Sequence, residues 1–424
     1  MPPSVFPTGV TIYEPGKAFN CYVLFDGREQ KSYLIDMNGN DVHVWNYRGF
    51  PAEMIDPALN QGRHGHVFAQ KEPDIFANET LLELDWEGTI VWQWGEKAPG
   101  GKAQQNHDQC RLPNGSTLVL AKLTHIVPDL SPDPLNDQAI YEVIPQGDIA
   151  WKWISSQHFD ELGFSSAEAK ALLMSSTMRP RSTLLVINNI QPLGPNKWHK
   201  AGDHRFHPDN ILIDSREASF MAIIEKRTGK IVWRLGPDYS GAYDFSKRSQ
   251  KRTFPRGVDM ISGQHDAHMI PEGLPGAGNI LVFDNHGSSG FPPFYLELFQ
   301  GSRVLEIDPI TEEIVWQYDA GSSGKPLWAF FSSFISSARR LPNGNTLICE
   351  GMHGRIFQVT SNGEIVWEYV SPHFGMWSDR DTDSGGNLTN WIFRAQPVPY
   401  DWVPKGTPRS EKGVKPSLTD FHIG

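Results

Sequence analysis

The chain has 424 residues, of which 39% are hydrophobic and 21% charged, and its formal net charge is −11. This balance is typical of a globular protein with a large core. The acidic excess argues against a nucleic-acid partner or an anionic membrane, both of which require basic patches. The N-terminus lacks the basic and apolar regions of a secretory signal, and no apolar run approaches the length of a membrane span. We therefore expect a soluble, cytoplasmic protein.

Its three cysteines carry no motif. Cys21, Cys110 and Cys349 lie far apart and lack the close spacing of metal ligands. Neither a disulfide framework nor a thiolate zinc site is indicated.

The first organising feature along the chain is an internal repeat. Six times, an apolar strand is followed by a turn and by a second strand that carries a tryptophan, at residues 32–45, 81–92, 140–151, 222–233, 304–316 and 356–367. The alternation of apolar and polar residues favours strands over helices. Five of the six turns contain a glycine, which supplies the positive φ that a tight hairpin needs. The recurring tryptophans are interpreted as structural wedges between repeats.

A second unit, a turn followed by a buried strand, precedes most copies of the repeat. The segments 112–120 and 341–348 are near duplicates, and looser versions lie at 209–213 and 278–282. Two hairpins per repeat make a four-stranded antiparallel sheet. Six such sheets, none of which can bury a face alone, predict an all-β, six-bladed propeller. The first repeat lacks its upstream strand, which residues 390–395 are expected to supply, so that N- and C-terminal strands close the ring.

The predicted blades form a single domain over residues 1–424. Their expected bounds are roughly 11–48, 49–95, 104–154, 181–236, 260–320 and 330–371. A capping box, Ser165 to Glu168, predicts a short helix in an insertion at about 156–180. The closing strand is expected at about 389–400 and a tail at 405–424.

Polar residues cluster where the innermost strands are expected to begin. In a propeller these strands line a central channel, so residues that start them meet in space. The starts carry His107 in one repeat, His199 or His204 in the next, and His265 in a third, and Arg339 precedes a further strand. The far ends of the second strands add Arg216, Asn285, His286 and His353. A histidine at the same position in three successive repeats favours a functional cluster.

Three motif blocks resemble one known family. They are Gln264-His265-Asp266-Ala267-His268 with Phe283-Asp284-Asn285; Asn106-His107-Asp108 before Leu112-Pro113-Asn114-Gly115; and Ser215-Arg216 before the segment 228–233. Together they resemble the arylsulfotransferases, bacterial enzymes that do not use a nucleotide sulfate donor. The resemblance covers roughly residues 80–370.

The resemblance implies a six-bladed propeller with a central histidine that becomes sulfated. By motif, the nucleophile falls on His265 and the supporting residues on His107, His199 and Arg216. His204 is an alternative to His199, and His268 is an alternative nucleophile. The other polar residues of the cluster are expected to bind substrate: His268, His204, Asn285, His286, His353 and Arg339.

The expected reaction moves a sulfuryl group from an aryl sulfate to a phenol, with water as a possible alternative acceptor. An imidazole, with an ordinary pKa of about 6.5, is a nucleophile that is largely neutral at pH 7. Cations and hydrogen-bond donors stabilise the negative charge on the transferred group. Small-molecule aryl substrates are thus the expected partners, no cofactor is required, and no oligomeric state is indicated.

Two other functions compete with this hypothesis. Several imidazoles that converge with carboxylates would suit zinc, copper or iron, and short-range pairs such as His204 with His207 offer chelation. A propeller with a passive channel would instead act as a binding scaffold. The segment 228–233 alone suggests a quinone-cofactor dehydrogenase, but that motif usually accompanies eight blades.

Overall fold

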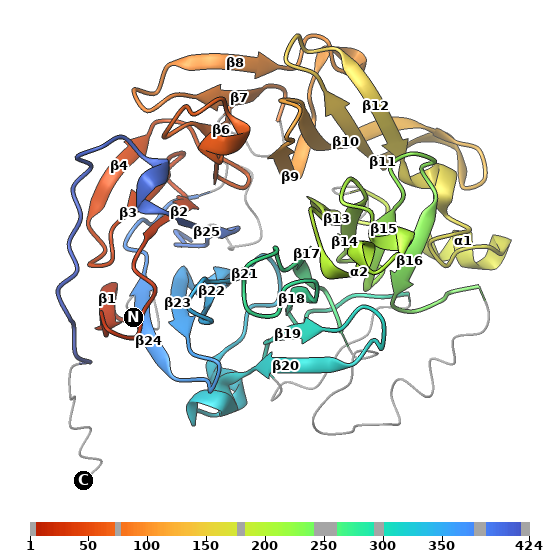
Figure 1. Ribbon diagram of the computed structural model, residues 1–424. Helices are drawn as coiled ribbons and strands as arrows, with labels where there is room; N and C mark the ends of the chain where they lie inside the picture. Colours follow the sequence, from red (N-terminus) through yellow and green to blue (C-terminus); the bar gives the residue numbers. More distant parts are fainter. Residues whose placement is uncertain are drawn as a thin grey trace.

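Six antiparallel sheets stand around a common axis (Figure 1). The computed structural model describes residues 6–72, 78–175, 183–240, 261–291, 301–376 and 387–416. The predicted six-bladed β-propeller is therefore confirmed. We number the blades 1 to 6 in chain order.

Each blade is a four-stranded meander. Blade 1 contains β25 (Ala395–Val398), β2 (Tyr22–Asp26), β3 (Ser32–Ile35) and β4 (Asp41–Trp45), and blade 2 contains β5 (Glu53–Met54), β6 (Val67–Gln70), β7 (Leu81–Leu84) and β8 (Ile90–Trp94). Blade 3 contains β9 (Gln105–Arg111), β10 (Thr117–Val127), β11 (Ser131–Val143) and β12 (Ile149–Ile154), and blade 4 contains β13 (Ile187–Pro192), β14 (Ile211–Ser215), β15 (Phe220–Ile224) and β16 (Ile231–Leu235). Blade 5 contains β17 (His265–Met269), β18 (Ile280–Asp284), β19 (Arg303–Ile307) and β20 (Ile314–Tyr318), and blade 6 contains β21 (Ser337–Arg340), β22 (Thr346–Glu350), β23 (Arg355–Val359) and β24 (Ile365–Val370).

Both ends of the chain contribute strands to the ring. The C-terminal strand β25 pairs antiparallel with β2, with Ala395 opposite Phe25, and becomes the innermost strand of blade 1. Residues 390–394 precede this strand and lie outside it. The N-terminal strand β1 (Gly9–Tyr13) adds a fifth, outer strand to blade 6 by pairing with β24.

Tryptophans bond each blade to the next. The indole Nε1 of an outer-strand tryptophan donates to a backbone carbonyl in the outer turn of the following blade, at 2.8–3.0 Å. The six bonds run from Trp45 to Asp85, Trp94 to Gly147, Trp153 to Gly229, Trp233 to Pro309, Trp316 to Ser361 and Trp367 to Met37. A buried indole needs a partner for its N–H, so these bonds fix the contact between neighbouring blades. In blade 2 the repeat's Trp92 makes an additional bond of this kind, to the carbonyl of Pro145 at 3.0 Å. In blade 3 the bond comes from Trp153, two positions after the repeat's Trp151.

Helices are few and short. The longest is α1 (Ala167–Leu173), whose N-cap is Ser166, the second serine of the predicted capping box. α2 (Lys197–Lys200) interrupts blade 4. The 3₁₀ helices among the described residues are η1 (Pro57–Leu59), η2 (Pro99–Gly101), η3 (Ser155–His158), η4 (His204–Phe206), η6 (Ala320–Ser323), η7 (Leu327–Ala329), η8 (Gly351–His353) and η9 (Tyr400–Trp402). In the described ranges, no helix has the length and apolar character needed to cross a membrane. Residues 176–180 of the predicted insertion and 417–424 of the predicted tail lie outside the described residues.

Candidate active site

Strand pairing gathers the functional residues at one face of the ring. In blade 4, Ile187 at the start of β13 lies opposite Ser215 at the end of β14, so Arg216 emerges beside the start of an innermost strand. In blade 5, His265 at the start of β17 lies opposite Phe283, which brings Asn285 to the same face. The prediction that these strand ends meet is correct for Arg216, His265 and Asn285.

Side-chain bonds between innermost strands define equivalent positions around the axis. Asp108 Oδ2 accepts from the backbone N–H of Ile190, Asp266 Oδ2 from that of Ala338, and Ser337 Oγ from that of Ala395. Asn189 likewise donates to the carbonyl of Ala267. The residues one position before these linked positions therefore share one level, which we call the mouth ring: His107, Asn188, His265, Ser336 and Phe393.

His265 is buried and held at both ring nitrogens. Its Nδ1 lies 2.7 Å from Asn285 Oδ1 and 3.0 Å from the carbonyl of Gly263, both of which are acceptors. Its Nε2 lies 3.1 Å from the backbone nitrogen of Ile335, which donates. These partners assign the proton to Nδ1 and the lone pair to Nε2. Burial, followed by the nearby Arg216, lowers the pKa of His265 to about 3. At pH 7 its imidazole is neutral.

His107 occupies the equivalent position in blade 3. Burial, then Arg216 and Arg394, lower its pKa to about 3, while a bond to the backbone of Ile187 acts in the opposite direction. The Nδ1 of His107 is buried and has no hydrogen-bond partner among the residues that the structure describes. A neutral imidazole that donates through one nitrogen keeps a lone pair on the other. His107 therefore presents an acceptor inside the site.

Arg216 is the cation of this group. Its guanidinium lowers the pKa of both His107 and His265, so its charge acts on both imidazoles. Glu217, the next residue, lies 3.1 Å from Arg216 Nη1 and is almost completely buried. One guanidinium between two neutral imidazoles suits an anionic group that also accepts hydrogen bonds.

Aromatic residues cover the opposite side of the mouth ring. Phe50, Ile335, Trp391 and Phe393 form one buried apolar cluster. The ring centroids of Phe50 and Phe393 lie 5.3 and 5.7 Å from that of His107, and Phe393 lies 6.3 Å from His265. The site is thus polar on blades 3 to 5 and apolar where blades 6, 1 and 2 meet it.

A buried belt of charged groups lies one residue further along the innermost strands. Arg394 Nη1 donates to Asp108 Oδ1 at 2.8 Å, and its Nε lies 3.2 Å from Asp266 Oδ1. Arg339 Nη2 also donates to Asp266, at 2.5 Å. The guanidinium of Arg339, which is predicted to bind substrate, takes part in this belt.

Three other predicted residues lie away from the two mouth-ring histidines. His268 is buried at the other end of β17, with Nδ1 2.8 Å from the carbonyl of Asp266, and burial followed by Arg339 lowers its pKa to about 3. The Nδ1 of His286 lies 3.2 Å from the carbonyl of Gly301. His353, in η8, packs against Phe6 with ring centroids 5.7 Å apart.

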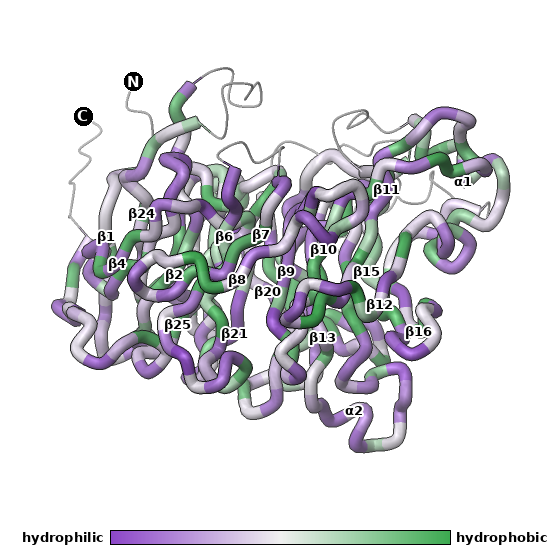
Figure 2. Tube along the Cα trace, turned by 90° about the horizontal axis from the view of Figure 1, so that it is seen from above, coloured by the Kyte–Doolittle hydropathy of each residue, from purple (hydrophilic) through white to green (hydrophobic). Residues whose placement is uncertain are grey.

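His199 and His204 are not at the start of an innermost strand, and that expectation is wrong. They lie in α2 and η4, within the connection that joins Pro192 of β13 to Ile211 of β14. This connection is at the opposite end of blade 4 from Arg216, and Figure 2 shows α2 projecting from the far face of the ring. His204 and His207 are exposed, with centroids 5.9 and 4.8 Å from that of His199.

Sequence reasoning missed the remaining members of the site. Asn188 holds the mouth-ring position in blade 4, is completely buried, and donates from Nδ2 to the carbonyl of Gln264 at 3.2 Å. Ser336, Phe393 and Phe50 were also missed. His107 and His265 were found because residues at the starts of innermost strands are expected to meet in space. The same expectation identifies Asn188, Ser336 and Phe393, once it is applied to the start of every innermost strand.

No cluster of metal ligands accompanies the site. Within the described ranges, no three or more histidine, cysteine, aspartate or glutamate side chains are arranged to hold a metal ion. The imidazoles of the mouth ring are bonded to amide, carbonyl and N–H groups of the protein.

The family of the chain follows from a match over most of its length. A family model described as arylsulfotransferase (ASST) matches residues 17–376. This chain therefore belongs to the arylsulfotransferase family, as the motifs indicated, and membership indicates a transferase that acts on small aryl compounds. A search of curated proteins finds no match.

A solved structure supports the overall fold. A protein of unknown function from Bacteroides caccae is 14% identical, with a TM-score of 0.50 over 90% of this chain and 99% of that chain. A catalytically inactive virginiamycin B lyase from Staphylococcus aureus is 10% identical, with a TM-score of 0.41 over 84% and 88% of the two chains. Quinohemoprotein alcohol dehydrogenase from Comamonas testosteroni is 11% identical, with a TM-score of 0.39 over 85% and 68%. At these identities the likeness concerns the fold alone.

Proposed function

We propose that this protein transfers a sulfuryl group from an aryl sulfate to a phenolic hydroxyl through a covalent intermediate on His265. The observation that carries the proposal is the state of His265: buried, neutral, protonated on Nδ1, and with its Nε2 lone pair directed at the backbone N–H of Ile335 in the connection that leads into blade 6. A neutral imidazole beside a guanidinium is suited to attack an anionic ester, because the cation offsets the repulsion that the ester's charge would otherwise cause.

In the first half-reaction, His265 Nε2 attacks the sulfur of the aryl sulfate. The N–S bond forms, the S–O bond to the aryl group breaks, and its electron pair leaves with the aryloxide. The sulfated ring keeps its proton on Nδ1, where the N–H donates a hydrogen bond to Asn285 Oδ1. The ring is therefore formally cationic and its sulfuryl group anionic. Arg216 stabilises the charge on the sulfuryl oxygens. The aromatic side of the site, Phe50 and Phe393, supports an aryl leaving group.

In the second half-reaction, a phenol attacks the same sulfur. Its hydroxyl proton passes to His107 Nδ1, the N–S bond breaks, and the electron pair returns to His265 Nε2. A phenol has a pKa near 10, so a base is required at neutral pH. His107 is our candidate because its Nδ1 is a buried acceptor with no partner in the described part of the chain. The imidazolium formed there releases its proton to solvent.

The test is intact-mass analysis of the protein after incubation with an aryl sulfate and no acceptor. We expect an adduct of about 80 Da, as for a covalent sulfuryl intermediate, which is absent in His265→Ala and disappears when a phenol is added. His268→Ala is the matched control, because His268 is a buried histidine on the same strand that faces the belt. An adduct that survives in His265→Ala contradicts the proposal. Inorganic sulfate released without added phenol would identify water as the acceptor.

A further inference from the structure

Both nitrogens of His265 have hydrogen-bond partners within the protein. The Nε2 lone pair, which must attack sulfur in the proposed reaction, accepts the backbone N–H of Ile335 at 3.1 Å. Ile335 belongs to the segment 331–336, the last part of the connection that joins β20 of blade 5 to β21 of blade 6. A donor placed on the attacking lone pair must either move away during attack or find another acceptor.

The segment that carries this N–H is held in an unfavourable backbone conformation. Ile335 has a φ of 55° and Ser336 a φ of 97°. Positive φ is rare for a β-branched residue, because Cβ crowds the backbone, and it persists only where the surroundings enforce it. Such enforced conformations concentrate at sites where a backbone group is aimed at a reacting atom.

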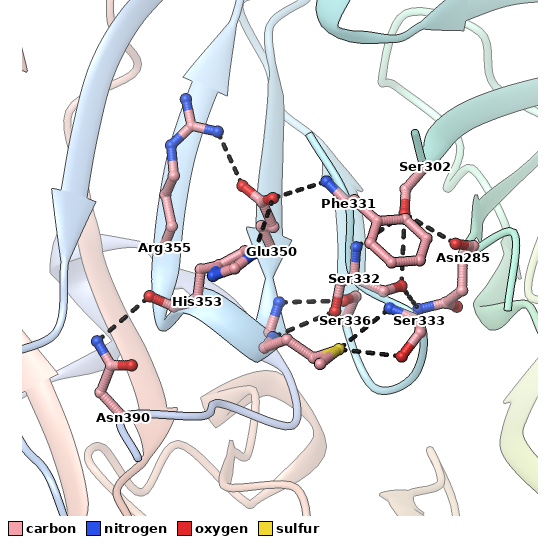
Figure 3. A network of polar contacts seen from close by, with 12 residues as sticks. Asn285, Ser302, Phe331, Ser332, Ser333, Ser336, Glu350, His353, Arg355 and Asn390 are labelled. Atoms are coloured by element: carbon pink, nitrogen blue, oxygen red, sulfur yellow. Dashed lines mark hydrogen bonds and ion pairs between the residues drawn. The ribbon is translucent and has the colours of Figure 1, made fainter. Parts of the chain in front are cut away.

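Asn285 enforces it and also holds His265. Its Nδ2 donates to the carbonyls of Ser332 and Ile335, both at 2.7 Å, and its Oδ1 lies 2.7 Å from His265 Nδ1. Figure 3 shows Asn285 and Ser302 beside Ser332 and Ser333 of this segment. Ser336 is fixed from blade 6, since its Oγ accepts the N–H of Gly351 at 3.0 Å. One carboxamide thus sets the position of the imidazole and of the N–H together.

We propose that the backbone N–H of Ile335 donates to a sulfuryl oxygen in the transition state, and that Asn285 is the positioning residue that aligns this donor with the nucleophile. The inference rests on the proposed function. As the N–S bond forms, Nε2 loses its lone pair to sulfur and stops accepting, while a sulfuryl oxygen, one bond from sulfur, comes within reach of the same N–H. The N–H of Ile335 shifts aside to admit the sulfur, and its hydrogen bond passes from nitrogen to oxygen.

This assignment revises the role of Asn285. The sequence placed it among the substrate-binding residues, but both hydrogens of its Nδ2 go to backbone carbonyls and its Oδ1 serves His265. It acts on the substrate through two neighbours. The donor that touches the substrate is a backbone group, which no side-chain pattern in the sequence can reveal.

The direct test removes the N–H donor and keeps every side chain, although the Phe334 carbonyl, which accepts from Ser332 Oγ, becomes a weaker ester acceptor. Replacing Ile335 by its α-hydroxy acid analogue converts the N–H into an ester oxygen and keeps the side chain. We expect the rate of sulfo-His265 formation to fall roughly 100-fold, as when one oxyanion donor is lost. The control is the same exchange at Ala329, the last residue of η7, whose N–H donates to the carbonyl of Pro326. A rate within about twofold of that control overturns the proposal. If the unmodified protein forms no adduct, it is the proposed function that fails.

A second variant tests the positioning role of Asn285. Asn285→Asp keeps an acceptor for Nδ1 but replaces the amide donor with an oxygen that faces two carbonyls. We expect slower adduct formation. We also expect the loss of this rate at acid pH to begin at a higher pH, because a carboxylate at Nδ1 favours the imidazolium. Ser302→Ala is the control, since Ser302 Oγ bonds the carbonyl of Asn285 and the N–H of Ser332 without touching His265. If both variants share one pH profile, Asn285 has only a structural role.

Discussion

His265 and His199 are both histidines next to an innermost strand, but His265 starts β17 and His199 lies beyond the end of β13. His265 starts β17, is buried, and has a defined partner at each nitrogen. His199 lies past the end of β13, in a surface connection beside the exposed His204 and His207. The sequence presents both as histidines near a strand, so what separates them is which end of the strand they occupy. In a propeller only one end of each innermost strand reaches this site.

The largest effect is expected at His107, the other imidazole that lies at the start of an innermost strand. We expect His107→Gln to slow transfer from sulfo-His265 to a phenol by roughly 10²–10⁴-fold, the usual contribution of a general base. An acceptor that is already ionised needs no base, so a nitrophenol at pH 9 should lose far less. Stopped-flow measurement of adduct decay with both acceptors checks this. Equal losses with the two acceptors would contradict a role in proton transfer.

The pH dependence of the first half-reaction tests the burial of His265. An exposed imidazole would lose half of its nucleophilic form near pH 6.5. Because the pKa of His265 is lowered to about 3, protonation should remove the Nε2 lone pair only below about pH 4. The rate of adduct formation should therefore be level from pH 8 down to about pH 5, measured where circular dichroism shows an intact fold. A midpoint near 6.5 would place His265 in solvent.

The smallest effect on the transfer rate is expected at His199 and His204, which lie past the end of β13. We expect the double substitution of His199→Ala and His204→Ala to change the overall sulfuryl-transfer rate by less than about twofold, since surface substitutions away from a site rarely disturb it. Steady-state turnover with a saturating phenol measures this. A loss of 100-fold or more would return these residues to the site and undo the distinction between strand ends.

The fold could be predicted because its signals are local and repeated. Turn glycines recur in five of the six outer hairpins and tryptophans in all six, and outer-strand tryptophans bond neighbouring blades, as their interpretation as wedges predicted. Arg216 and Asn285 were also found, because each directly follows a recognisable apolar strand.

The rest of the site lacked such signals. In blade 3 the turn between the first two strands is the compact Leu112–Gly115, but in blade 4 the same turn has grown to residues 193–210 and contains α2. That long turn resembles a loop that enters a blade, so its histidines were assigned to the wrong end. The true first strand, β13, contains the buried Asn188 and Asn189 and shows no alternation. Ile335 acts through its backbone, which sequence patterns do not report.

The pairing of β25 with β2 has a consequence for the order in which the protein is made. Chains are synthesised from the N-terminus, and early segments fold as they emerge. Phe393 and Arg394, which supply an aromatic wall and the guanidinium between Asp108 and Asp266, lie just before the C-terminal strand. His107, Arg216 and His265 therefore leave the ribosome well before the residues that enclose them. The site proposed here is completed only once residues 393 and 394 have been added, and a nascent chain halted before residue 393 would carry His107, Arg216 and His265 without the residues that enclose them.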